Sequence, residues 1–221
     1  CETVNYPHHD VPVDTWVLGL FIWNGVLGEF PLTISSGIEE IPMRIARKYN
    51  WTFKRSSKKN YSYIFYDKNG KRIQTREFFK DLPEMIGKYS YEKTIPNIYV
   101  YNDPETRLEL LKGLMDTDGS ISESDERFHT MYSSCSEKLL EQIRQILFSF
   151  GFRSSITKDK RADKYTNGCN GNLVLNIPNE FKRQFFSISS KYEIASKAYN
   201  YPQQDYYSDL RIKDIKIVKR E

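Results

Sequence analysis

The chain has 221 residues and a mass of 26.1 kDa, which is enough for one large domain or for two small halves that share a core. Apolar residues make up 39% of it and aromatic residues 14%, which excludes a disordered polypeptide. The net charge of +4 is compatible with a polyanionic partner but does not require one.

Cysteine and histidine usage excludes several kinds of site. Cys1, Cys135 and Cys169 are odd in number and widely spaced, so we expect neither a disulfide framework nor a structural zinc site. Only three histidines are present, and a metal site would therefore depend on oxygen ligands. No apolar run has the roughly 18–20 residues of a membrane span, and residues 1–14 lack the pattern of a signal peptide. We expect an intracellular protein of a reducing compartment, the cytoplasm or the nucleus.

The first predicted helix covers residues 13–25, which carry apolar side chains on every face, so this helix should be buried. The turn signal Asn69-Gly70 lies farther along the chain. After the first helix we expect a strand at residues 30–35, an amphipathic helix at 41–49 and two paired strands at 51–55 and 61–67. A short strand at 72–75 follows the turn, and a closing helix covers residues 78–87.

A second helix that resembles the first covers residues 103–119, with Asp103 as its cap and Pro104 at its first position. Farther on, Ser136 caps an amphipathic helix that Gly151 ends. The elements expected after residue 119 repeat the earlier order: residues 127–133, 137–150, 152–158 with 172–177, 180–186 and 191–199.

This repetition predicts an α+β fold of two pseudo-symmetric halves, each ordered helix, strand, strand, helix, strand, strand, helix. Residues 1–13 form a lead-in, and the halves are residues 14–102 and 103–200. Residues 201–221 form a tail, with an alternating strand-like stretch at 210–218 outside the repeats. The polar stretch 158–171 is predicted to be a long loop.

Residues 111–119 read Leu-Lys-Gly-Leu-Met-Asp-Thr-Asp-Gly and resemble the LAGLIDADG signature, with six of its nine letters. Residues 17–25 lie where a duplicated member of that family carries its second copy, although only Gly19, Leu20 and Gly25 are kept. The resemblance covers nearly the whole chain. It implies αββαββα repeats, a saddle-shaped antiparallel sheet in each half that holds duplex DNA, and divalent metal at the ends of the two motif helices.

The residues of the motif agree with this chemistry. Gly113 and Thr117 are four positions apart, a small-residue stripe that lets two helices approach closely. Asp118 follows at the helix C-terminus, where a carboxylate is unfavourable unless a cation compensates it. Two such carboxylates would bind Mg²⁺ or Mn²⁺ for phosphodiester hydrolysis. We therefore predict metal ligands at Asp118, Asn24 and Gly119. The alternative for Asp118-Gly119 is a plain helix cap and turn, and Asp116 is interpreted as a capping or packing residue.

The first half departs from the family pattern at the position equivalent to Asp118, because Asn24 is a neutral amide. Unit charges 4 Å apart interact by about 4 kcal/mol at an effective dielectric constant near 20, so losing one carboxylate removes much of the attraction for a metal ion. Trp23 also stands where a small residue is expected opposite Thr117. Glu29 is the nearest substitute carboxylate, or else an exposed acid at a strand entry. We expect weak metal binding and hydrolysis that is reduced, limited to nicking, or lost.

Basic residues cluster in corresponding parts of both halves, which favours a DNA-binding surface over a solvated strand face. The predicted DNA-binding residues are Lys54, Arg55, Lys58, Lys59, Lys71, Arg72, Arg153, Lys158, Lys160, Arg161 and Lys164. The resemblance also implies a basic residue near the active site, which we assign to Lys54 and Lys158. The choice among Lys54, Lys58, Lys158 and Lys160 stays open.

Several functions are consistent with this pattern. The first is a monomeric, site-specific endonuclease of double-stranded DNA. Cys1 is typical of a splicing nucleophile, which suggests the endonuclease domain of an intein and a host splicing domain as a partner. Cys1 is nevertheless better interpreted as a bystander, because the last residues, 219–221, read Lys-Arg-Glu and are not a His-Asn terminus. The alternatives are an inactive DNA- or RNA-binding module similar to a maturase, and a structural insert of an intein.

Overall fold

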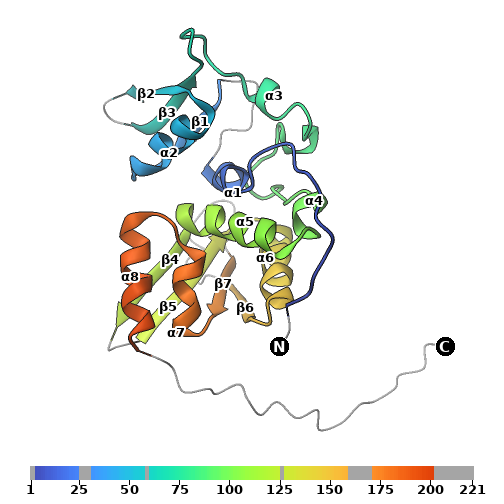
Figure 1. Cartoon of the computed structure of the whole chain (residues 1–221), viewed down its shortest axis with the longest axis vertical. Helices are drawn as coiled ribbons and strands as arrows, with labels where there is room; N and C mark the ends of the chain where they lie inside the picture. The colour runs from blue at the N-terminus through green and yellow to red at the C-terminus, as the bar shows by residue number, and fades with distance from the viewer. Residues whose placement is uncertain (1–2, 25–30, 58–59, 125–126, 159–170, 202–221) are drawn as a thin grey trace, which may run out of the picture.

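The computed structural model of the chain describes residues 3–24, 31–57, 60–124, 127–158 and 171–201. Two halves, each an antiparallel sheet with helices, lie on either side of a central pair of helices (Figure 1). This arrangement confirms the α+β fold with two repeats. The strand-like stretch 210–218 lies outside the described residues, and so does the predicted loop, except for its end residues Lys158 and Gly171. Within the described ranges, no helix is both long and apolar enough to span a bilayer.

The first half contains a three-stranded sheet with strand order β1-β3-β2. Its elements are α1 (Thr15–Asn24), β1 (Thr33–Ser35), α2 (Glu40–Tyr49), β2 (Thr52–Ser57), β3 (Asn60–Tyr66), α3 (Thr75–Phe78) and the 3-10 turn η1 (Pro83–Met85). The single helix predicted at 78–87 is wrong: two short turns replace it, because Pro83 restricts Leu82 to a non-helical conformation. The strand predicted at 72–75 is reduced to two isolated bridges, one between Tyr66 and Arg72 and one between Pro31 and Gln74.

The second half contains a four-stranded sheet with strand order β4-β5-β7-β6. Its elements are α4 (Asn97–Val100), α5 (Pro104–Thr117), β4 (Gly119–Ser124), β5 (Arg127–Ser134), α6 (Glu137–Ser149), β6 (Arg153–Lys158), β7 (Gly171–Asn176), α7 (Asn179–Lys182), η3 (Arg183–Phe185) and α8 (Ser189–Tyr199). The sequence did not predict β4, because it is rich in serine and glutamate and has Ile121 as its one large buried side chain. Pairing with β5 makes it a strand.

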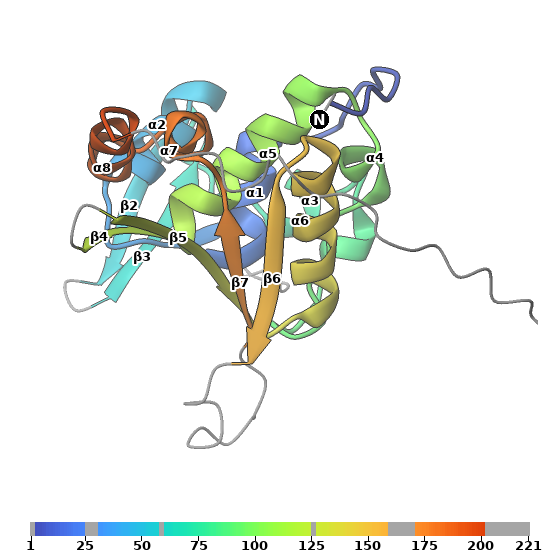
Figure 2. The same cartoon turned by 90° about the horizontal axis from the view of Figure 1, so that it is seen from below.

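Each sheet has one face against helices and one face turned away from them. In β5 the alternation is strict: Phe128, Thr130 and Tyr132 are buried, and the residues between them are exposed. Helices α6 and α8 contact this sheet and lie together on its buried face, as the second view shows (Figure 2). The opposite face of each sheet, here called its open face, carries mostly polar side chains.

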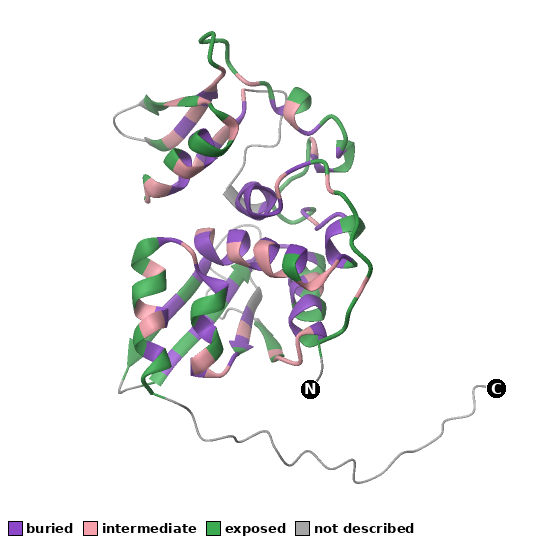
Figure 3. Ribbon diagram, in the orientation of Figure 1, coloured by how far each residue is buried: buried purple, intermediate pink, exposed green. Residues whose placement is uncertain are grey.

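The two halves meet where α1 crosses α5. Residues 15–22 of α1 are all buried, as the even apolar distribution predicts (Figure 3). The closest approach joins Gly19 to Gly113: a Cβ atom added to Gly113 would lie 2.1 Å from the carbonyl oxygen of Trp16. The hydroxyl of Thr117 donates to the Leu114 carbonyl of its own helix at 2.8 Å. A pair of glycines, one from each half, therefore sets the helix spacing.

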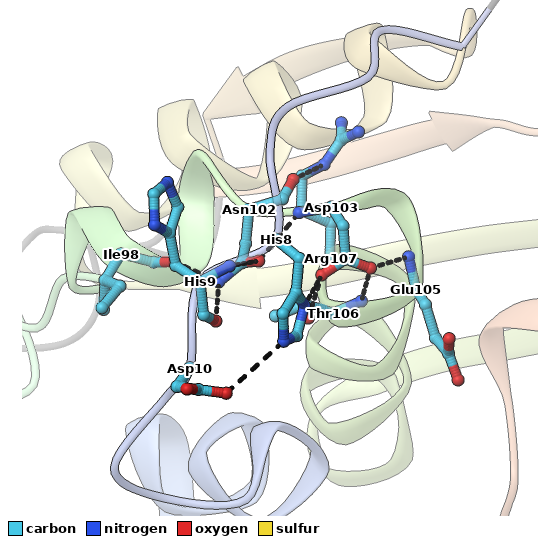
Figure 4. A network of polar contacts seen from close by, with 9 residues as sticks. All are labelled: His8, His9, Asp10, Ile98, Asn102, Asp103, Glu105, Thr106 and Arg107. Atoms are coloured by element: carbon cyan, nitrogen blue, oxygen red, sulfur yellow. Dashed lines mark hydrogen bonds and ion pairs between the residues drawn. The ribbon is translucent and has the colours of Figure 1, made fainter.

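The lead-in crosses α4, α5 and α6 of the second half before α1 begins (Figure 1). The backbone N–H and carbonyl of His9 both bond to the side chain of Asn102, and His8 bonds to Asp103, the cap of α5 (Figure 4). Arg107 is fully buried and donates to the carbonyl oxygens of Asn102 and Val4 and to the hydroxyl of Ser149. The lead-in is thus tied by hydrogen bonds to the surface of the second half.

We expect Arg107→Met to lower the free energy of unfolding by roughly 2–4 kcal/mol, because several buried acceptors lose their donor. The guanidinium also lies 5.1 Å from the ring of Tyr6 and 4.8 Å from the ring of Phe150, contacts that methionine replaces only in part. Urea denaturation measures the change. Arg144→Met is the matched control, since Arg144 is exposed and pairs with Glu141 one helical turn away. A loss at Arg107 no larger than the loss at Arg144 would contradict this account.

Candidate functional site

Asp118 follows the last residue of α5 at the junction of the two halves. Its backbone N–H donates to the Leu114 carbonyl at 3.2 Å, which makes it the C-cap of the helix. Its side chain is half-buried, and Oδ2 is buried with no hydrogen-bond partner among the described residues. A cavity of about 330 Å³ lies beside it, lined from the first half by Ser35, by residues 36–38 between β1 and α2, and by Ile41 and Tyr61. Asp118 therefore faces the other half of the molecule.

Two lysines act electrostatically on this carboxylate. Lys93 precedes α4 and is 6% exposed, and Lys191 lies in the first turn of α8. Burial raises the pKa of Asp118 to about 7, against the opposing effect of Lys191 and Lys93. Burial also lowers the pKa of each lysine to about 8, although nearby carboxylates, Asp118 among them, act against this shift. The site is therefore a buried group of one carboxylate and two ammonium groups.

The ammonium of Lys191 lies among the carbonyl oxygens that end α5. Its Nζ donates to the carbonyls of Met115 at 2.8 Å, Asp116 at 2.9 Å, Thr117 at 2.8 Å and Gly119 at 2.7 Å. The C-terminal carbonyls of a helix lack intrahelical partners and carry partial negative charge. Lys191 satisfies these carbonyls from a different element of the same half.

Asp116 is fully buried and joins three elements. One carboxylate oxygen accepts from the indole N–H of Trp16 at 2.8 Å and from the Ser187 hydroxyl. The other accepts from the backbone N–H groups of Ser187 at 2.8 Å and Ile188 at 3.1 Å. These bonds tie α1, α5 and the segment before α8 together, so Asp116 is a structural carboxylate with no free oxygen for a ligand.

The predicted site residues are placed as follows. Asn24 ends α1 and lies five positions after Gly19, as Asp118 lies five positions after Gly113, so the two occupy equivalent places relative to the helix crossing. The side chains of Asn24, Trp23 and Lys158 are outside the described part of the structure. The same holds for Glu29, Lys58, Lys59, Lys160, Arg161 and Lys164. The pairing of Asn24 with Asp118 stays a prediction.

The structure brings Lys93 and Lys191 to Asp118, and sequence reasoning assigned neither. Lys54, which was assigned there, lies on the open face of the first sheet with its Nζ 5.4 Å from the ring centre of Tyr66. One signal could have indicated Lys191: it is a cation in the first turn of a helix, where the helix dipole disfavours positive charge. A lysine in that place therefore needs a compensating contact, and Lys191 has one with the carbonyl oxygens at the end of α5.

The predicted DNA-binding residues with described side chains lie mostly on the open faces. In the first sheet Lys54 is exposed, and Arg72 shares its face through the bridge to Tyr66. Lys71 is exposed beside it, and Arg55 lies on the opposite side of β2, 4.7 Å from the ring of Tyr61. In the second sheet Arg153 is exposed on the open face of β6. The sequence did not predict Arg127, which is exposed on the open face of β5.

The metal ion implied by the resemblance can be tested against the donors present. Among the described residues, no group of three or more His, Cys, Asp or Glu side chains could hold a metal ion. Asp118 offers one carboxylate, but the carbonyl of Gly119 already accepts from Lys191. Lys93 adds a second positive charge near that carboxylate. One carboxylate beside two ammonium groups does not fit a divalent cation.

Comparison with known proteins identifies the class of both halves. Residues 105–189 match the family model of the LAGLIDADG-like domain. Residues 14–94 match the model of the WhiA LAGLIDADG-like domain. Each half of the chain thus contains a LAGLIDADG-like match.

Two curated relatives match part of the chain. The ATP-dependent DNA helicase Hel308 of Thermococcus kodakarensis is 33% identical over 95 residues, which are 42% of this chain and 8% of that protein. Protein RecA of Mycobacterium bovis is 32% identical over 107 residues, 47% of this chain and 13% of that protein. The chain thus corresponds to a small part of each relative's length.

Two solved structures show the kind of similarity found. Full-length DUF199/WhiA from Thermatoga maritima is 13% identical with a TM-score of 0.53, over 86% of this chain and 60% of that chain. Mesophilic variants of the homing endonuclease I-DmoI are 11% identical with a TM-score of 0.48, over 86% of this chain and 96% of that chain. At these identities the similarity to DUF199/WhiA shows the fold alone.

Proposed function

We propose, since the chain carries two LAGLIDADG-like domains, that it binds double-stranded DNA as a monomer across the open faces of its two sheets. The observation that carries this proposal is the pair of open faces, each of which presents basic side chains away from the helices. Lys54 and Arg72 lie on the first face, and Arg127 and Arg153 lie on the second. Guanidinium and ammonium groups contact phosphates, and short polar side chains between them can contact base edges.

The test of this proposal is binding to duplexes selected from a randomised library, measured in EDTA over a range of salt concentrations. We expect the logarithm of the binding constant to fall linearly with the logarithm of salt concentration, with a slope that indicates several phosphate contacts. Lys54→Gln and Arg153→Gln should each reduce that slope by about one. Arg144→Gln, on the exposed side of α6, is the control and should leave it unchanged.

Other outcomes would contradict this function. No binding at low salt would leave the structural insert as the better interpretation. Preference for an RNA duplex over the selected DNA would favour the maturase-like alternative, because the two helices present different groove shapes. A slope that changes equally in all three variants would show that the open faces are not the binding surface.

We propose further that phosphodiester hydrolysis by this chain is lost or limited to nicking. Asn24 supplies no charge at the position equivalent to Asp118, and the remaining carboxylate has two lysines beside it. Incubating the selected duplex, labelled on both strands, with Mg²⁺ or Mn²⁺ tests this: we expect no double-strand cleavage. If nicking occurs, Asp118→Asn should abolish it. Asn24→Asp should increase it. Efficient double-strand cleavage by the unaltered chain would contradict the proposal.

The association with a longer protein is also proposed. The two curated relatives match this chain over 8% and 13% of their own length, which supports a module carried within a larger polypeptide, as the predicted host intein would be. Sequencing the gene around the coding region tests this directly. An open reading frame that does not extend beyond these residues would contradict it.

A further inference from the structure

The end of α5 is built around one positive charge. Four carbonyl oxygens, those of Met115, Asp116, Thr117 and Gly119, lie 2.7–2.9 Å from the Nζ atom of Lys191. An ammonium group has three N–H donors, so these four contacts include a shared one. Each contact is within the ordinary hydrogen-bond range. The oxygens therefore form a cradle around a single cation, with Lys191 as its occupant.

The chemistry of this cradle is that of a hard-cation site. Backbone carbonyl and carboxylate oxygens are the ligands that Mg²⁺, Ca²⁺ and Mn²⁺ use in proteins. The helix end adds partial negative charge, and the carboxylate of Asp118 comes next in the chain. Because the ammonium already donates hydrogen bonds to these oxygens, a divalent ion would have to compete with it for the same atoms.

The position of Lys191 is fixed by the segment that carries it. The backbone N–H groups of Ser187 and Ile188 bond to the buried carboxylate of Asp116, and the N–H of Ser189 bonds to Glu40 Oε2 at 3.0 Å. Thus α8 begins at a point that both halves hold in place. Moving the ammonium out of the cradle would break its contacts with the four carbonyl oxygens, while the start of α8 would stay fixed.

We propose that Lys191 is a tethered cation that occupies the end of α5 in place of a divalent metal ion. The protein then holds the negative end of this helix and the Asp118 carboxylate in charge balance without any bound metal. This inference does not depend on the proposed DNA binding, because it concerns the free protein.

The test measures Mn²⁺ binding to the free protein without DNA. The loss of the free-ion signal in electron paramagnetic resonance reports how much Mn²⁺ is bound. We expect no Mn²⁺ bound at this site in the unaltered chain. In Lys191→Met the cradle loses its occupant, and we expect one new site with at least about tenfold higher affinity, since ligand charge tunes such sites. The double variant Asp118→Asn with Lys191→Met should lose this gain. Lys197→Met, an exposed lysine of the same helix, is the control and should bind as the unaltered chain does.

A second variant keeps the test decisive if Lys191→Met does not fold. Lys191→Gln keeps donors for part of the cradle and removes the charge, and circular dichroism reports whether each variant is folded. Adding Mn²⁺ should raise the midpoint temperature of thermal unfolding of either folded variant, and it should leave that of the unaltered chain unchanged. Stoichiometric Mn²⁺ binding by the unaltered chain that Asp118→Asn abolishes would overturn the proposal. So would a folded Lys191 variant whose Mn²⁺ affinity and stability match the control.

Discussion

Replacing Gly113 by alanine should lower the free energy of unfolding by about 4 kcal/mol or more. An added Cβ atom would lie 2.1 Å from the carbonyl oxygen of Trp16 and 3.0 Å from the Cα atom of Gly19. These are backbone atoms of the opposing helix, so no side chain can rotate away and α1 must move. Overpacking a core typically costs 1–3 kcal/mol, and a backbone collision should exceed that range. The gain in helix propensity from glycine to alanine, about 1 kcal/mol, is too small to offset it.

Thermal unfolding measures this effect, and a loss of that size should lower the midpoint by roughly 10 °C. Gly37→Ala is the matched control, because a Cβ atom there meets nothing within 4 Å. It should leave stability unchanged or raise it slightly. Gly19→Ala should resemble Gly113→Ala, since its Cβ would lie 2.6 Å from the Leu110 carbonyl oxygen. If Gly113→Ala behaves as Gly37→Ala does, the two helices do not cross at these glycines.

The second large effect is expected from Asp116→Asn, which keeps the side-chain size and should cost roughly 3–5 kcal/mol. The carboxylate accepts from the Trp16 indole and from the backbone N–H groups of Ser187 and Ile188, and all of these are donors. An amide would turn an N–H₂ group toward at least one of them, leaving buried donors unsatisfied. Each such group costs about 1–3 kcal/mol.

Urea denaturation measures this loss, and Trp16 supplies a second readout because its indole bonds directly to the carboxylate. We expect the indole N–H signal in an NMR spectrum to shift in Asp116→Asn. Glu109→Gln is the control on the same helix: its carboxylate pairs with Lys112 at the surface and should contribute less than 1 kcal/mol. Equal losses in the two variants would show that Asp116 does not link the halves.

The lysines near Asp118 show what the sequence could not decide, and the assignments of Lys54 and Lys158 stay predictions. Lys54 and Lys158 were assigned from their place after the middle helix, which is a statement about order along the chain. Lys93 and Lys191 reach Asp118 from segments that are far from it in sequence, one before α4 and one at the start of α8. The place of Lys191 in the first turn of α8 is a local signal, but it does not say which group the lysine contacts, because that depends on how α8 packs against the second sheet. The close helix approach predicted at Gly113 is confirmed, and its partner across the crossing is Gly19.

The amino-acid pattern was sufficient by itself for the two repeats, the buried motif helices, the strand pairs and the LAGLIDADG-like domains, because these depend on periodicity, caps and a nine-residue motif that act over short distances. The folded chain alone decided which groups surround Asp118. The hydrogen bonds that Lys191 donates to four carbonyls, and those that Asp116 accepts from Ser187 and Ile188, form only when segments separated by about 70 residues are packed together. Charge balance at a buried site is a property of that packing, and no single segment carries it.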